Sequence, residues 1–271
     1  METRVFKIDP NYKIVNIVGK GEIPINIVRG PRIVFFTGAG ISAASGIPTY
    51  RNTNGSLTNA LWENYDPIKC SHISSLGTKD YIAFKQLMRE KLLLAQPNDA
   101  HKWISGLQRV LGNRVYIITT NVDDLHELSG SRNVLHLHGE SNYLCCSNRP
   151  ECDYREFIGL GNHSYPEQQQ CPKCNQSILR TDVVLFGERL GEEYQIAIEL
   201  LNSLTDNDII VSIGSSYSIF PFHHIIEASK AKSINVTLDG DDDINSCFDI
   251  VIQKPIEKCI DELHKLLKNY K

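Results

Sequence analysis

The chain has 271 residues and a formal net charge of −4 at pH 7, with 41% hydrophobic and 22% charged residues. This composition is ordinary for a globular protein and provides no bulk attraction to nucleic acid or to an anionic membrane. Because no apolar stretch reaches the roughly 18 residues of a membrane helix and the N-terminus lacks the apolar core of a secretory signal, we expect an intracellular protein, cytoplasmic or nuclear.

The predicted elements alternate between strands and helices after an irregular N-terminal arm at residues 1–30. Apolar runs typical of buried parallel strands cover residues 33–37, 115–119, 134–137, 208–213, 234–238 and 248–252. Helical periodicity covers residues 79–94, 98–111, 192–204 and 221–230, and a last helix is expected at 255–267. This alternation predicts an α/β fold with a Rossmann-like, doubly wound parallel sheet. We assign the sheet domain to residues 31–142 and 181–271, with a helical insertion at about 49–97.

The polar segment at residues 143–180 interrupts the alternation and has too few apolar residues to form a core. It contains five of the eight cysteines, among them the pair Cys171 and Cys174, with Cys146 and Cys152 upstream. In a reducing compartment such cysteines are thiols or metal ligands. Four thiolates suit a closed, structural zinc site, whose formation would fold the segment. Because Cys145 adjoins Cys146, the spacing alone leaves the first ligand open between them.

A glycine-rich loop follows the first predicted strand. Gly38, Gly40 and Ala43 form the pattern G-x-G-x-x-A, which brings backbone N–H groups close to a pyrophosphate at a helix N-terminus. The acidic residue that dehydrogenases use to bind the ribose is missing at its usual distance of about 20 residues. Arg51, which can bind a phosphate with two hydrogen bonds, follows instead. The loop predicts dinucleotide binding for a reaction other than hydride transfer, and a tight glycine turn without a ligand is the alternative.

Five segments resemble one enzyme family in the family's own order. They are GAGISAASGIPTYR, TTNVDDLHELSG, LHLHGE, LRTDVVLFGE and IGSSYSIFP, and the resemblance extends from Gly38 to about Asn235. This pattern is similar to that of the sirtuins, NAD-dependent protein-lysine deacylases. The resemblance implies a small zinc-binding lobe at 143–180, with Cys146 rather than Cys145 as the first ligand. It also implies NAD+ as cosubstrate, an acyl-lysine protein as substrate, and nicotinamide and O-acyl-ADP-ribose as products, with deacetylation as the expected activity.

The resemblance further implies roles for individual residues. His138 would be the general base, with Asn121 and Asp123 beside the ribose and the nicotinamide carboxamide, whereas His136 would be structural. The residues expected to bind NAD+ are Gly38, Ala39, Gly40, Ser42, Ala43, Tyr50, Arg51, Thr120, Asn121, Asp123, His138, Gly214, Ser215, Ser216 and Asn235. The peptide would pair with the strand edge at Val184, Leu185, Phe186 and Gly187. The zinc ligands would be Cys146, Cys152, Cys171 and Cys174.

Four positions depart from the family pattern. Thr49 and Tyr50 replace an acidic residue and a phenylalanine, Thr120 replaces a glutamine that touches the ribose, and Thr237 replaces a glutamate. A threonine is shorter than glutamine and lacks its amide, so the ribose would be positioned differently. Protein ADP-ribosyl transfer or NAD hydrolysis on the same fold is therefore the alternative activity, and a non-catalytic NAD-binding module is a third hypothesis.

Two residues after the glycine loop bear on the acyl preference, and the net charge bears on the partners. Lys85 and Met88 stand where family members that prefer succinyl groups carry a tyrosine and an arginine. We therefore expect no succinyl preference. The negative net charge argues against a nucleic-acid partner, no membrane partner is expected, and the oligomeric state is not predicted.

Overall fold

The computed structural model describes residues 30–49, 65–159, 169–238 and 241–270. The expected N-terminal arm, apart from residue 30, and the candidate NAD-binding residues Tyr50 and Arg51 lie outside the described residues. None of the helices in the described ranges is both long enough and apolar enough to span a membrane.

The larger lobe is built on a parallel sheet with the strand order β3-β2-β1-β7-β8-β9. The strands are β1 (Ile33–Thr37), β2 (Val115–Thr119), β3 (Val134–His136), β7 (Ile209–Ile213), β8 (Lys232–Thr237) and β9 (Ile250–Gln253). This is the Rossmann order, in which the direction of winding reverses between β1 and β7. Thr37 is in register with Thr119 on one side and Ile213 on the other, so three strands end level beside the crevice. The predicted fold class is confirmed.

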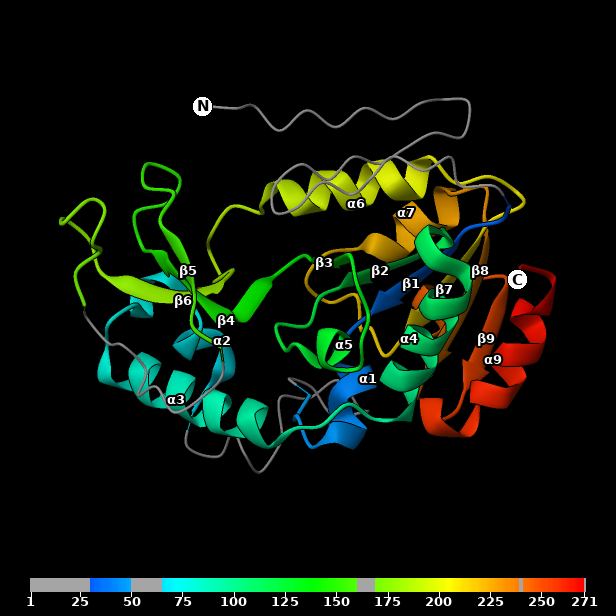
Figure 1. The fold of residues 1–271 in the computed structure, drawn as a ribbon, viewed down its shortest axis with the longest axis horizontal. Coiled ribbons are helices and arrows are strands. Elements are labelled where there is room, and N and C mark those ends of the chain that lie inside the picture. Colours follow the sequence, from blue (N-terminus) through cyan, green and yellow to red (C-terminus); the bar gives the residue numbers. More distant parts are fainter. Residues whose placement is uncertain (1–29, 50–64, 160–168, 239–240, 271) are drawn as a thin grey trace.

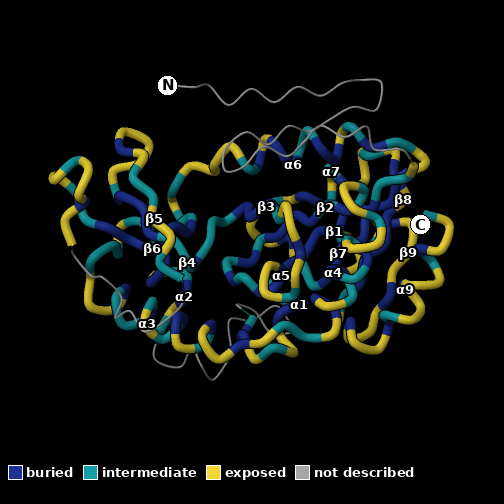
Figure 2. Tube along the Cα trace, in the orientation of Figure 1, coloured by how far each residue is buried: buried dark blue, intermediate teal, exposed yellow. Residues whose placement is uncertain are grey.

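Helices cover both faces of this sheet. Ile33 and Phe35 pack in one core with α4 (Asp99–Leu111) and α9 (Ile260–Leu266). Val34 and Phe36 point to the opposite face and pack with α6 (Glu192–Asn202) and α7 (Phe222–Ala228). Figure 2 shows the central strands β1, β2 and β7 as the buried part of this sheet, whereas the edge strand β9 is largely exposed. Burial on both faces explains why the strands appear in the sequence as continuous apolar runs.

Helix boundaries follow local capping. The side chain of Thr78 accepts the Tyr81 N–H at the start of α3 (Lys79–Leu94), and Asn98 caps α4 in the same way. The expected last helix is wrong at its start, because a 3₁₀ turn (Ile256–Lys258) precedes α9 and Cys259 between them has a non-helical backbone. The remaining short helices are α1 (Ala39–Ser42), α2 (Pro67–Cys70), α5 (Leu125–Leu128) and α8 (Asp242–Asn245).

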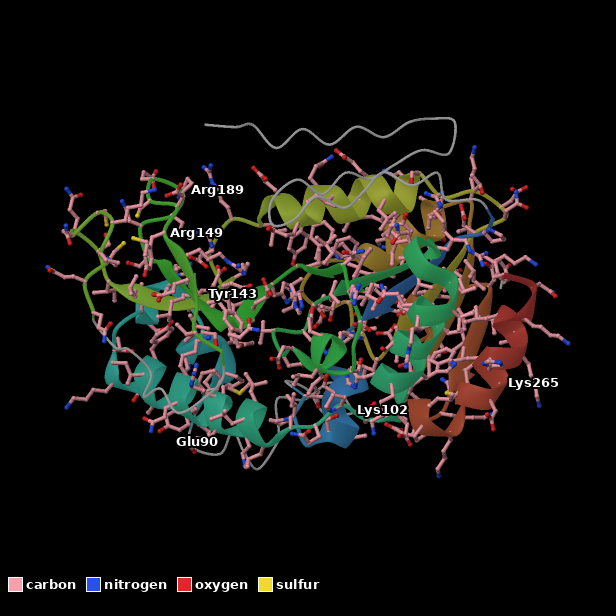
Figure 3. The ribbon with its side chains drawn as sticks, in the orientation of Figure 1. Glu90, Lys102, Tyr143, Arg149, Arg189 and Lys265 are labelled. Atoms are coloured by element: carbon pink, nitrogen blue, oxygen red, sulfur yellow. The ribbon has the colours of Figure 1, made fainter. Side chains whose placement is uncertain are left out.

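The smaller lobe contains an antiparallel sheet with the order β5-β4-β6. Its strands are β4 (Gly139–Cys146), β5 (Arg155–Phe157) and β6 (Leu179–Val183). This lobe lies beside α2 and α3, at the opposite end of the molecule from α9 (Figure 1). Asp182 on β6 pairs with Arg149 at 2.6 Å and with Arg155, whose guanidinium lies 3.4 Å from the ring centre of Tyr143. Tyr143 and Arg149 are seen on this lobe in Figure 3.

Candidate active site

A cavity of about 580 Å³ lies at the carboxyl ends of the central strands and extends to the segment after β6. This volume falls in the range of about 300–1,000 Å³ that is usual for ligand pockets. The cavity brings together these predicted site residues: Gly38, Ala39, Gly40, Ser42, Ala43, Thr120, Asn121, Asp123, His138, Val184, Leu185, Phe186, Gly187, Gly214, Ser215 and Ser216. Asn235 does not line it, since its buried side chain donates to Asn245 Oδ1 at 2.9 Å.

Two glycine loops form the wall of the cavity between β1 and β7. The Gly40 N–H donates to the Gly214 carbonyl at 2.9 Å. A Cβ atom on Gly40 would lie 2.6 Å from the Gly214 Cα, and Gly214 itself has a φ of +63°. The two loops therefore pack backbone against backbone, which only glycine permits at these positions.

A buried hydrogen-bond network joins the loop after β1 to the loop after β2. The Ser42 hydroxyl donates to Asp123 Oδ2 at 3.0 Å, and Asn121 Nδ2 donates to the Ser42 oxygen at 3.0 Å. Burial raises the pKa of Asp123 to about 6, although the Leu125 N–H and the Ser42 hydroxyl act in the opposite direction. A buried carboxyl with a pKa displaced toward neutrality is typical of a functional site.

His138 stands where the chain passes from the large lobe into the small one. Burial lowers the pKa of His138 from its ordinary value of 6.5, although the nearby Thr120 backbone acts in the opposite direction. The next residue, Gly139, has a φ of +79°, and a Cβ there would lie 2.1 Å from the Asp182 carbonyl oxygen. With its pKa lowered by burial, His138 is neutral at pH 7 and can accept a proton at its ring.

His136 has a different environment, although it lies only two residues earlier. Its Nδ1 is 2.9 Å from the Asn121 carbonyl oxygen and its Nε2 is 3.0 Å from Glu127 Oε1. Burial lowers the pKa of His136, but the hydrogen bond and charge of Glu127 outweigh burial and raise it to about 9. His136 does not line the cavity, and it holds the Asn121 backbone in place.

The segment Val184 to Gly187 borders the cavity and is fixed by its neighbours. Glu188 accepts the Leu185 N–H at 2.7 Å and pairs with Arg180 at 2.5 Å. The N–H groups of Val184 and Phe186 donate to the carbonyls of His138 and Ser71, both at 2.8 Å. Among the described residues, the Gly187 N–H and the Val184 carbonyl make no backbone hydrogen bond and are available to an added peptide strand.

Three further residues line the cavity without having been predicted to bind the cofactor. Tyr194 has its ring centre 6.0 Å from that of His138, and its buried hydroxyl has no hydrogen-bond partner in the described part of the chain. The Ser71 hydroxyl is buried without a partner there as well. Burial, with Arg180 nearby, lowers the pKa of Lys85 to about 8. Unpaired buried polar atoms in a cavity suit a polar ligand. No sequence motif identifies Tyr194, because its place in a periodic helix predicts only core packing.

The four predicted zinc ligands converge in the small lobe. The Sγ atoms of Cys146 and Cys174 are 3.7 Å apart, as are those of Cys152 and Cys171, and all four lie within 4.8 Å of one another. A tetrahedral zinc with Zn–S distances of about 2.3 Å has S–S edges of about 3.8 Å. The N–H of Gln176, together with that of Ser177, lowers the pKa of Cys174 to about 6, which favours the thiolate. The donor set therefore fits Zn²⁺, and Cys145 lies outside it.

Comparisons with known proteins agree on one family. A family model described as the Sir2 family matches residues 38–221. The NAD-dependent protein deacylase of Helicobacter hepaticus is 30% identical over 263 residues, which cover 89% of this chain and 98% of the relative. The NAD-dependent protein deacetylase of Saccharolobus solfataricus is 33% identical over 251 residues, covering 90% and 94%. A crystal structure of a Sir2 homolog–NAD complex matches with a TM-score of 0.72 and 30% identity over 89% of this chain and 91% of that one.

Proposed function

The chain belongs to the Sir2 family, and from this premise we propose that its cavity catalyses the NAD-dependent removal of acyl groups from protein lysines, with deacetylation as the main activity. The observation that carries the proposal is the meeting of His138, Asn121 and Asp123 with the glycine loops in a single cavity. An ordinary dinucleotide site has no need of a neutral histidine and a buried carboxyl in the same cavity.

NAD+ supplies a ribose carbon from which nicotinamide leaves as the acyl oxygen of the substrate attacks. The loops at Gly38 and Gly214 would bind the phosphates and the adenosine side through backbone groups. Asp123 would accept a hydrogen bond from the nicotinamide carboxamide, and Asn121 would orient the ribose. Ser42 is hydrogen-bonded to both side chains and so keeps their spacing.

Proton transfer is assigned to His138. The backbone of Thr120 favours the protonated ring and so would help His138 to take a proton from a ribose hydroxyl. Thr120 acts on His138 through its backbone. The change from glutamine to threonine alters only the side chain. The threonine at this position therefore leaves the base intact.

The zinc ion would be structural. Cys146, Cys152, Cys171 and Cys174 would surround it completely, leaving no position for a water molecule. The ion would fold the module at 143–180, from which β6 leads directly into the peptide-binding segment. Zinc would therefore support substrate binding through the position of Val184 and Gly187 and take no part in the chemistry.

The substrate in this proposal is an acyl-lysine in a protein or peptide, paired with the Gly187 N–H and the Val184 carbonyl. Lys85 and Met88 both line the cavity, and the pair that would recognise a succinyl carboxylate is missing, so no succinyl preference is expected. An intracellular location and the absence of nucleic-acid and membrane partners belong to the same proposal, as does the division into a sheet domain and a zinc module.

The proposal is tested by following nicotinamide release with and without an acetyl-lysine peptide. We expect release that depends on the peptide, accompanied by loss of the acetyl group, and at least about 100-fold slower release in His138→Ala. His264→Ala, on the exposed side of α9, is the matched control and should keep full activity. Release without peptide would establish NAD hydrolysis instead, and a peptide that gains ADP-ribose would establish transfer.

A further inference from the structure

A second group of metal-binding side chains lies outside the cavity and the zinc module. His223 and His224 are on α7, and Cys247 follows α8. Their ligand atoms all lie within 4.8 Å of one another. The two ring centres are 4.1 Å apart. Fold topology brings Cys247 to the two histidines, since β8 and α8 separate them in the sequence.

We propose that His223, His224 and Cys247 bind a second transition-metal ion of the zinc class. One thiolate and two imidazoles form a donor set that Zn²⁺ and Co²⁺ favour over Ca²⁺ or Mg²⁺, which require oxygen ligands. Metal–ligand distances of about 2.0–2.3 Å need the three atoms slightly closer together than 4.8 Å, which side-chain rotation provides. His224 is two-thirds exposed, at 66%, and is free to make this adjustment.

The surroundings of the three side chains favour a cation. Nδ1 of His223 is buried and has no hydrogen-bond partner among the described residues. Glu227 has its Oε2 3.6 Å from Nδ1 of His224, and its carboxylate also contacts the Cys247 thiol. Glu227 or a water molecule would therefore complete a tetrahedral site. Asp241 and Asp243 add negative charge, the latter accepting the Cys247 S–H at its carbonyl.

The ion would connect two separate parts of the large lobe. It would join α7 to the turn after α8, which otherwise meet through apolar packing. The ring of His223 lies 5.3 Å from that of Tyr217, and both Tyr217 and Phe222 line the main cavity. Metal binding would therefore restrict the motion of Tyr217 and Phe222 in the wall of the NAD cavity, while the metal itself would lie outside the cavity.

The stoichiometry of zinc tests this site directly. The purified full chain is equilibrated with Zn²⁺ buffered at micromolar free concentration, and bound zinc is measured by mass spectrometry. We expect two ions per chain in the native protein and one in His224→Asn, in which an exposed side chain changes and the fold is retained. Cys247→Ser should also bind one ion. Cys70→Ser and His264→Asn are matched controls and should bind two.

Cobalt identifies the ligands. The difference between the visible spectra of the Co²⁺-loaded native protein and His224→Asn should show a tetrahedral ion with a single thiolate, distinct from the four-thiolate ion that both proteins share. One zinc per chain in the native protein would overturn the proposal. Two ions retained in both His224→Asn and Cys247→Ser would overturn it equally, because the second ion would then lie elsewhere.

Discussion

The buried carboxyl of Asp123 should make the stability of the folded protein depend on pH, whether or not the protein is catalytically active. Asp123 is 5% exposed, and burial raises its pKa from 3.8 to about 6. The folded state therefore binds a proton at Asp123 more tightly than the unfolded state does. The resulting stabilisation is fully present below pH 3.8 and is lost as the pH rises through about 6. Above that pH the folded protein carries a buried charge that Asp123→Asn removes.

The magnitude follows from the two pKa values. A carboxyl whose pKa rises from 3.8 to about 6 on folding lowers the free energy of unfolding by about 3 kcal/mol at pH 7.5, where it is charged in both states. At pH 5 the folded protein is protonated at Asp123, and the loss of unfolding free energy falls to about 1.6 kcal/mol. Asparagine has one acceptor oxygen fewer for the Ser42 hydroxyl and the Leu125 N–H, but this loss is the same at both pH values. The free energy of unfolding of Asp123→Asn, measured relative to that of the native protein, should therefore be about 1.4 kcal/mol higher at pH 7.5 than at pH 5.

Urea unfolding of both proteins at pH 5 and pH 7.5, followed by far-ultraviolet circular dichroism, measures this difference. Asp208→Asn is the matched control, because Arg32 holds the pKa of the buried Asp208 below its ordinary value against the effect of burial. The ion pair of Asp208 with Arg32 stabilises the folded state at every pH above the unfolded pKa of 3.8. Asp208→Asn should therefore lower the free energy of unfolding by a similar amount at both pH values. If the difference in unfolding free energy between Asp123→Asn and the native protein does not change with pH, or changes in the opposite direction, Asp123 does not carry a buried charge at pH 7.5.

Three further predictions concern the loops, the zinc and the base. Gly40→Ala should weaken NAD binding at least about tenfold in a calorimetric titration, because its Cβ meets the Gly214 backbone at 2.6 Å. The control Gly106→Ala, whose Cβ meets nothing within 4 Å, should bind NAD normally. Cys171→Ser should lose one zinc per chain and lower the Tm by at least about 5 °C, whereas Cys145→Ser should retain zinc, and equal zinc content in both would disprove the ligand assignment. Because burial lowers the pKa of His138, the acid limb of kcat/KM for deacylation should lie below pH 6.5, and a limb above pH 7 would exclude His138 as the base.

Much of the fold was predictable because burial leaves a direct trace in the sequence. Strands covered on both faces must be apolar throughout, so β1, β2 and β7 are found at or within one residue of the predicted bounds. Glycines at close backbone contacts cannot be replaced, and thus Gly40 and Gly214 mark the crevice. The resemblance to sirtuins rests on these same segments, and the comparisons confirm it.

Features that depend on side-chain direction were not predictable. Asn235 lies on the expected strand, but its amide bonds to Asn245 instead of facing the cavity. Tyr194 reaches His138 only because α6 crosses above β3, and a helical period does not contain that information. The group of His223, His224 and Cys247 is likewise assembled by the tertiary fold from separate segments. Spacing also left Cys145 and Cys146 as alternatives, whereas the alternation of β4 turns Cys146 toward the other three thiols.

Coupling of NAD+ cleavage to deacetylation is measured by the stoichiometry of a single reaction. Purified protein, NAD+ and an acetyl-lysine peptide are incubated together, and nicotinamide, deacetylated peptide and O-acetyl-ADP-ribose are measured in the same sample. We expect equal amounts of the three products throughout the reaction. Nicotinamide formed in excess of deacetylated peptide, with free ADP-ribose or an ADP-ribosylated peptide making up the difference, would contradict this expectation.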